Sequence, residues 1–170
     1  YRGAIVIDAA SGRVLFQDNA DAKGIPASLV KLMDLVIILE KVEHGQLSLN
    51  DRVPVSAKAA SMPQSNVNLS PKESFTVDEL LYALMVRSAN DAAVALAEKV
   101  GGSTEGFIEL MNRKAHELGL TTTVFHSVNG LPPGRGQEHC FTTARDIAHL
   151  ALEVLKHPEA LRYTSTRTRV

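Results

Sequence analysis

The chain contains 170 residues, of which 45% are hydrophobic and 22% are charged, and its net charge is −1. This composition is typical of one soluble domain, and the near-neutral charge gives no electrostatic reason to expect nucleic acid or an anionic membrane as a partner. The longest apolar run, residues 29–39, is shorter than a membrane span and carries Lys31 and Asp34. A single cysteine, Cys140, excludes a disulfide framework within the chain.

The first half of the chain begins with two strand-like runs. Ala4–Ala9 and Arg13–Gln17 flank a Gly-containing turn, so we predict a β-hairpin. An apolar helix is predicted from Ser28 to about His44, since Gly45 follows it. Residues 47–71 show no strong period, and we expect loops there with a short strand pair.

The second half of the chain is predicted to be mainly helical. A helix should begin at Thr76, which forms a capping box with Glu79, and it should end near Arg87. Three more helices are predicted, at 91–101, 104–118 and 143–156, and a loop is expected at 131–137. The terminal residues Tyr163–Val170 alternate like a strand with one solvated face. The order of elements indicates an α+β fold.

Ser28 and Lys31 form a candidate catalytic pair at the start of the first helix. Side chains at i and i+3 lie on one face about one turn apart. A serine becomes a good nucleophile when a neighbour accepts its proton, and burial lowers the pKa of a lysine enough for it to do so. An alternative stays open at this point: Ser28 caps the helix at the surface and Lys31 extends to water.

The tripeptide Ser88-Ala89-Asn90 interrupts an otherwise good helical pattern between Met85 and Asp91. Its residues prefer turns and helix caps. A hydroxyl and an amide two residues apart on such a turn can reach a bound substrate or a catalytic lysine. The alternative is an ordinary helix connection in which Asn90 is the N-cap.

The sequence shows no pattern for a metal or a phosphate group. None of its six histidines stands in a metal-binding spacing such as H-E-x-x-H, and its glycines close helices or punctuate loops. We therefore expect no metal and no cofactor.

The combination S-x-x-K with S-x-N resembles the signature of penicillin-recognising serine enzymes. The surrounding residues resemble one branch, the low-molecular-mass penicillin-binding proteins that are serine-type D-alanyl-D-alanine carboxypeptidases. The similar stretches are IVIDAASGRVLFQDNADAKGIPASLVKLM, LLYALMVRSANDAAVALAEKVGGSTEGFIELMNRKAHELGL and FTTARDIAHLA. The resemblance runs through essentially the whole chain.

The resemblance implies a role for each motif residue. Ser28 would be the nucleophile, its backbone N–H would be half of the oxyanion hole, and Lys31 would be the general base. Ser88 would relay protons, and Asn90 would bind the substrate's peptide backbone. The substrate would be a peptidoglycan stem peptide ending in D-Ala-D-Ala, β-lactam antibiotics would acylate the same serine, and no metal or cofactor would be needed.

The resemblance also implies a β-lactamase/transpeptidase-like fold, in which an antiparallel sheet built from both chain ends carries an inserted helical lobe. The chain would be one catalytic domain, with residues 1–45 and 141–170 in the sheet-associated lobe and 46–140 in the helical lobe. The location would be extracytoplasmic, in the periplasm or at the cell surface. A signal peptide and any membrane anchor would lie outside this chain.

Three positions depart from the family pattern. Val30 precedes Lys31 where the family usually has Thr, and Asn129 stands where many relatives carry His. The K-T-G motif of a later strand is absent from the sequence, because the only lysine past Lys114 is Lys156, in a predicted helix. We therefore expect the chain to lack the C-terminal strands, to be impaired alone, and to take the missing C-terminal segment as its partner.

Two other functions remain open from the sequence. A class A β-lactamase-like hydrolase usually carries S-D-N where this chain has Ser88-Ala89-Asn90, and no E-x-x-L-N-like stretch is present to supply a deacylating glutamate. A non-catalytic peptidoglycan-binding module would keep the fold without turnover.

Overall fold

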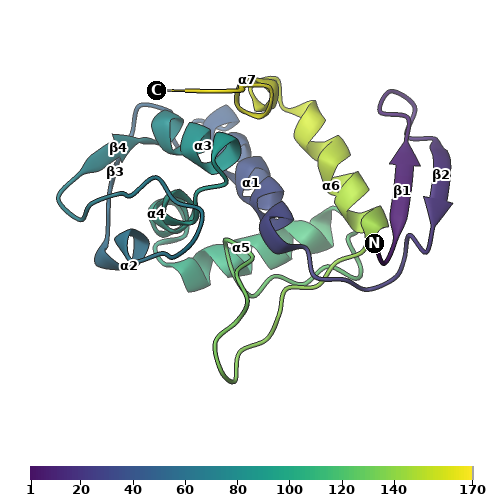
Figure 1. Ribbon diagram of the computed structural model, residues 1–170. Helices are drawn as coiled ribbons and strands as arrows, with labels where there is room; N and C mark the ends of the chain where they lie inside the picture. Colours follow the sequence, from purple (N-terminus) through teal and green to yellow (C-terminus); the bar gives the residue numbers. More distant parts are fainter. Residues whose placement is uncertain (170) are drawn as a thin grey trace.

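The computed structural model describes residues 1–169, in which helices surround the central helix α1 and two small sheets lie on opposite sides (Figure 1). The four strands are β1 (Ala4–Ile7), β2 (Val14–Asp18), β3 (Arg52–Pro54) and β4 (Ser74–Thr76). The seven α-helices are α1 (Lys31–Glu43), α2 (Ala57–Ala60), α3 (Val77–Val86), α4 (Asn90–Gly101), α5 (Thr104–Glu117), α6 (Ala144–Lys156) and α7 (Ala160–Thr164). In this range, no helix has the length and apolar character needed to cross a membrane.

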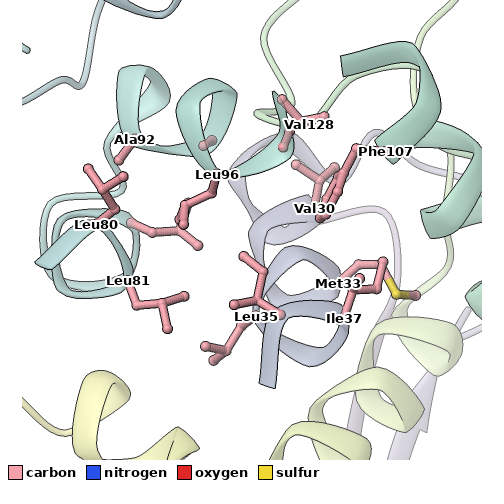
Figure 2. Packing of buried hydrophobic residues seen from close by; sticks show 14 of the residues in the cluster. Val30, Met33, Leu35, Ile37, Leu80, Leu81, Ala92, Leu96, Phe107 and Val128 are labelled. Atoms are coloured by element: carbon pink, nitrogen blue, oxygen red, sulfur yellow. The ribbon is translucent and has the colours of Figure 1, made fainter. Parts of the chain in front are cut away.

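Helix α1 is apolar on nearly every side because it passes through the centre of the core. Every residue from Met33 to Leu39 is buried. Figure 2 shows Leu80, Leu81 and Leu96 of α3 and α4 on one side of α1, with Phe107 and Val128 on another. This packing holds the first turn of α1 rigidly, which matters because that turn carries Lys31.

The predicted N-terminal hairpin is confirmed. Strands β1 and β2 pair antiparallel, with Ala4 opposite Asp18 and Val6 opposite Phe16. The turn is closed where Asp8 O accepts from the N–H of Gly12, whose φ of +71° suits glycine. The hairpin packs against α6 through β1. The short strand pair expected between residues 47 and 76 is also present, as β3 and β4.

The predicted break between two helices is confirmed at Ser88-Ala89-Asn90. Helix α3 begins with the predicted capping box, in which Thr76 Oγ1 accepts from Glu79 N and Glu79 Oε2 accepts from Thr76 N. It ends at Val86, and α4 begins at Asn90. Ser88 lies between them with a φ of +55°, a left-handed conformation that ends the helical path.

The strand predicted over Tyr163–Val170 is wrong. Residues 160–164 form helix α7, and no strand follows within the described residues; residue 170 lies outside them. Tertiary packing explains the difference, because Tyr163 is fully buried, contacts the Tyr82 ring edge-on at 4.8 Å and donates to Asp78 Oδ1. The alternating Thr, Ser and Arg residues match the period of a strand. The contacts of Tyr163 with Tyr82 and Asp78 of α3 are instead made from a helical turn.

Candidate active site

Ser28 lies on a short 3₁₀ helix, Ala27–Val30, that leads directly into α1. The predicted helix therefore starts as expected, but its first turn is 3₁₀ and α1 proper begins at Lys31. Ser28 is exposed, and its backbone follows Ala27, whose φ of +50° is rare for a residue with a side chain. A serine hydroxyl on an exposed, strained turn is accessible to a bound molecule.

Gly130 supports this turn from a distant part of the chain. Its φ is +73°, and a Cβ atom at this position would lie 1.9 Å from Ala27 O. Only a residue without a side chain fits so close to another backbone. Gly130 therefore positions the strained peptide that precedes Ser28.

Lys31 is buried, with 2% of its surface exposed. Its Nζ lies 2.7 Å from Asn90 Oδ1, 3.3 Å from Ser88 Oγ and 3.3 Å from the backbone oxygen of Asn129. The alternative in which Lys31 extends to water is therefore wrong, and so is the role of Ser28 as a helix cap, since no side chain caps α1 or the 3₁₀ helix. Residues from three separate segments meet at one amine.

Burial lowers the pKa of Lys31, and the nearby carboxyl of Asp34 opposes this shift. The contacts of Lys31 are compatible with a neutral amine. Asn90 Oδ1 and Asn129 O can only accept, so they take the two hydrogens of a neutral amine. The Ser88 hydroxyl, 3.3 Å from Nζ, can donate to the remaining lone pair. Lys31 can thus lose its proton without leaving a buried group unpaired.

The side chain of Asn90 is fully engaged within the protein. Its Oδ1 accepts from Lys31, and its Nδ2 donates to the backbone oxygen of Pro63. Its backbone N–H donates to Ser65 O. Asn90 is also 3% exposed and is not the N-cap of α4, which is Ala89. In this structure Asn90 holds the lysine in place.

Ser28, Lys31 and Ser88 line the same cavity. Its volume is about 340 Å³, and its wall is formed by Pro26, Ala27, Ser28, Leu29, Lys31, Leu32, Leu84, Met85 and Ser88. Asn90 is not among the lining residues. Among residues 1–169 the backbone N–H of Lys31 donates to Ser28 O, but no hydrogen bond joins the two side chains, although both residues line the cavity. A larger hollow of about 720 Å³ between β1 and α6 contains none of the predicted site residues.

A possible metal-ligand cluster lies elsewhere, at the contact of α1 with α6. Glu40, Glu153 and His157 each bring one ligand atom within 4.8 Å of the others. Both carboxylates already pair with lysines, Glu40 with Lys114 at 2.8 Å and Glu153 with a neighbour on its own helix. His157 Nδ1 lies 2.8 Å from Glu43 Oε1. These pairs account for the cluster as an ion-pair network between helices.

Sequence reasoning missed three residues that touch this site. Asn129 contributes a backbone oxygen, which no side-chain pattern reveals, and it was considered only as a departure from the family. Gly130 acts through a close backbone approach that the sequence signals only as a loop glycine. Asp34 was noted only as a charge that argues against a membrane span, although it lies one turn from Lys31 and is buried.

The fold, together with the contact of the S-x-x-K lysine with both polar residues of S-x-N, places the chain among the penicillin-recognising serine enzymes. Within that class, residues 2–169 match the family described as D-alanyl-D-alanine carboxypeptidase, and the chain belongs to this family.

Curated relatives carry the same activity in their names. The chain is 38% identical to the D-alanyl-D-alanine carboxypeptidase DacF of Bacillus subtilis, with 97% of the chain matched to 41% of the relative. It is 41% identical to the D-alanyl-D-alanine carboxypeptidase DacC of Escherichia coli, with 88% of the chain matched to 38% of the relative. The chain therefore spans about two fifths of the length of these relatives.

Solved structures confirm the predicted fold class. The crystal structure of the D-alanyl-D-alanine carboxypeptidase DacD from Francisella tularensis aligns with a TM-score of 0.90 at 35% identity, covering 96% of this chain and 39% of that one. Penicillin-binding protein 6B from Escherichia coli aligns with a TM-score of 0.91 at 28% identity, covering 99% of this chain and 54% of that one.

Proposed function

We propose that the protein containing this chain is a serine D-alanyl-D-alanine carboxypeptidase that acts on peptidoglycan stem peptides through an acyl-enzyme and is acylated by β-lactams. One observation carries the proposal: Lys31 is buried, contacts Ser88 and shares a cavity with the exposed Ser28. This arrangement combines an accessible nucleophile with a lysine whose pKa is lowered by burial.

The proposed reaction begins when Lys31, as a neutral amine, accepts the proton of the Ser28 hydroxyl. Ser28 Oγ then attacks the carbonyl carbon of the penultimate D-alanine, and the oxyanion that forms is stabilised by backbone N–H groups at the turn, including that of Ser28. Ser88 lies 3.3 Å from Lys31 Nζ, so it can pass the proton to the amine of the departing D-alanine. The C–N bond breaks, and an ester on Ser28 remains.

The second half of the proposed reaction returns the enzyme to its starting state. Lys31 is neutral again once its proton has left with D-alanine, so it can activate a water molecule. The water attacks the ester, and the proton it releases returns through Lys31 to Ser28 Oγ. Asn90, as a substrate-binding residue, would contact the peptide backbone after a local rearrangement, because its amide is engaged with Lys31 and Pro63.

The site of action that fits this substrate is extracytoplasmic, where peptidoglycan stem peptides are found. The proposed ligands of the cavity are a stem peptide ending in D-Ala-D-Ala and β-lactam antibiotics. The proposed residues need no metal or cofactor for acyl transfer, since the base and the nucleophile are both side chains.

The test is acylation of the full-length protein by a fluorescent penicillin. We expect covalent labelling of the wild type and none of Ser28→Ala, because the ester forms on Ser28 Oγ. Ser11→Ala, a change of the same kind in the hairpin turn, should label normally. Release of D-alanine from a D-Ala-D-Ala peptide should follow the same pattern.

Two outcomes would contradict the proposal. An intact, folded wild type that takes up no label would indicate a peptidoglycan-binding module without turnover. Rapid loss of the label, with hydrolysed penicillin as the product, would indicate a β-lactamase.

A further inference from the structure

Asp34 is a buried carboxyl group that the proposed reaction leaves unexplained. It lies on α1, 1% exposed, and neither of its side-chain oxygens has a hydrogen-bond partner among the described residues. Buried polar side chains are nearly always paired, so such a group needs a reason to persist.

The surroundings of Asp34 are apolar. One turn away on either side lie Val30, just before α1, and Ile38 on α1, both with no exposed surface, and Met33 and Leu35 beside it in sequence are equally buried. Figure 2 shows this stretch of α1 enclosed by core side chains from neighbouring helices. In such an environment a carboxylate has little to stabilise its charge except another charge.

Lys31 supplies that charge. The two residues are three positions apart on one helix, so their side chains share a face. Burial raises the pKa of Asp34 well above its ordinary value, and the field of Lys31 opposes this shift. The converse also holds, because burial lowers the pKa of Lys31 and the field of Asp34 opposes it. Each group therefore makes the ionised form of the other less costly.

The other ionisable side chains on the helices that pack against α1 are engaged elsewhere or exposed. The buried Tyr82 on α3 accepts from Arg162. Asp78 on α3 binds Arg162 and Tyr163, Asp91 on α4 accepts from backbone N–H groups, and Asp146 on α6 accepts from Thr122 and Thr123. Lys114 on α5 pairs with Glu40, and Glu153 on α6 pairs with Lys156. Those on the outer faces of these helices are partly or fully exposed, namely Glu79, Glu98, Lys99, Glu105, Glu109, Arg113, His116, Glu117, Arg145 and His149. Among the described residues, Lys31 is the charged group whose field acts on Asp34.

We propose that Asp34 is a positioning residue for the acyl transfer, and that its negative charge offsets the burial of Lys31 so that the amine remains a strong enough base. This inference rests on the proposed function, since it assigns a task to Lys31. A base works best when its proton affinity suits the working pH. Burial alone would make Lys31 easy to deprotonate but weak at taking the proton of Ser28.

The proposal has a definite proton balance. The reacting pair carries no titrating proton: Lys31 is a neutral amine beside the Asp34 carboxylate. When Lys31 accepts the proton of Ser28 it becomes an ammonium beside that carboxylate, and one negative charge appears on the new oxyanion, so the total charge is unchanged. The proton then leaves with the amine of D-alanine, and the pair returns to a neutral amine beside a carboxylate.

The test is the pH dependence of acylation by a fluorescent penicillin in full-length wild type and Asp34→Asn. Without the carboxylate, Lys31 should hold its proton less tightly, so the acid limb of the profile should move to lower pH by about one to two units. The plateau rate should fall several-fold, because a weaker base accepts the Ser28 proton less readily.

Glu40→Gln is the matched control, because it makes the same chemical change on the same helix, nine positions from Lys31. Glu40→Gln should leave both the acid limb of the acylation profile and its plateau rate unchanged. A structural role for Asp34 would lower the rate of Asp34→Asn without moving the limb, and that result would overturn the proposal.

A second measurement needs no variant. In wild type, ¹⁵N NMR of Lys31 Nζ and ¹³C NMR of Asp34 Cγ should each report two titration steps at shared midpoints, as coupled groups do. A single ordinary carboxyl transition at Asp34 would contradict the proposal. The two hypotheses fail separately: absence of Ser28-dependent labelling would disprove the proposed function, while the NMR titration would still decide whether Asp34 and Lys31 are coupled.

Discussion

The amine of Lys31 is surrounded by groups that can each change its protonation state. Asn90 provides the nearest oxygen, Oδ1 at 2.7 Å, and Asp34 provides the nearest acidic group on α1. One of these neighbours is a neutral amide and the other is a carboxyl. Replacing the amide of Asn90 by a carboxyl and replacing the carboxyl of Asp34 by an amide should therefore shift the pKa of Lys31 in opposite directions.

The variant Asn90→Asp tests this at the residue scale. A carboxylate in place of the amide would stabilise the ammonium form and raise the pKa of Lys31. The acid limb of the acylation profile should move to higher pH, opposite to the shift expected for Asp34→Asn. Asn50→Asp, which adds the same charge at an exposed position, should leave the profile unchanged. A downward shift in Asn90→Asp would show that Lys31 does not act as the base.

The motif residues could be singled out from sequence because side-chain chemistry and spacing carry the signal, and their catalytic and binding roles stay predictions. Ser28, Lys31, Ser88 and Asn90 were all named, and the structure brings Lys31 into contact with both Ser88 and Asn90. Asn129 was not assigned to the site because it acts through its backbone oxygen, and every residue type has one. A contact made by the main chain depends on the path of the fold.

At the scale of elements, the loop between α5 and α6 supports the 3₁₀ turn of Ser28 through Gly130. The variant Gly130→Ala would bring a Cβ atom to within 1.9 Å of Ala27 O and would also require a positive φ. We expect a loss of about 2–4 kcal/mol in the free energy of unfolding, combining roughly 1–2 kcal/mol of backbone strain with the cost of overpacking. Acylation should slow as well, because the turn that carries the nucleophile must shift.

Gly136→Ala separates the two contributions to this loss. Gly136 has a φ of +82° and nothing within 4 Å of its added Cβ, so its alanine variant pays only for backbone strain. Chemical denaturation should show a smaller loss for Gly136→Ala, and its acylation rate should equal that of wild type. Equal losses in both variants would show that the contact with Ala27 is unimportant.

The limits of prediction at this scale follow from packing. The helix starting at Ser28 was expected, yet its first turn is 3₁₀, because a left-handed Ala27 and the nearby Gly130 determine how the chain enters α1. Helix α7 was mistaken for a strand because its alternating polar residues matched a period of two. Capping boxes are different: the pair Thr76 and Glu79 acts locally, so the sequence alone located the start of α3.

At the scale of the whole molecule, Asp34 makes stability depend on pH. A carboxyl whose pKa is higher in the folded chain than in the unfolded chain contributes stability below its ordinary pKa of about 3.9, and that stability is lost as pH rises through the raised value. Asp34→Asn does not titrate here, so its stability relative to wild type should increase with pH above about 4. The increase can reach about 1.4 kcal/mol for each pH unit in this window.

Denaturant unfolding of both proteins from pH 4 to pH 8 measures this difference. Asp8→Asn provides a comparison of opposite sign, because Ser11 donates to the Asp8 carboxylate and lowers its pKa. Stability from Asp8 is present above the ordinary carboxyl pKa and is lost as pH falls. The relative stability of Asp8→Asn should therefore decrease as pH rises toward about 4 and stay constant above it, so the measurement on this variant extends below pH 4. A pH-independent difference for Asp34→Asn would show that Asp34 is ionised as easily as a surface carboxyl.

The α+β class was predictable for the whole molecule because the hairpin and the amphipathic helices each leave a period in the sequence and the central helix is a continuous apolar run, while the transpeptidase-like fold followed from the family resemblance. The burial of Asp34 was not, since a charge on an apolar helix is compatible with either a solvated or a buried position. Only the position of the surrounding helices decides between these two.

The contacts of Lys31 join segments that are 57 and 98 residues apart in the chain. A collapsed or misfolded chain does not hold these segments together, so under the proposed function covalent uptake of a penicillin requires native tertiary structure. In-gel fluorescence of a penicillin-treated cell extract would therefore count the correctly folded molecules directly. It would serve as a conformational assay for destabilised variants and for quality control in the cell, without purification.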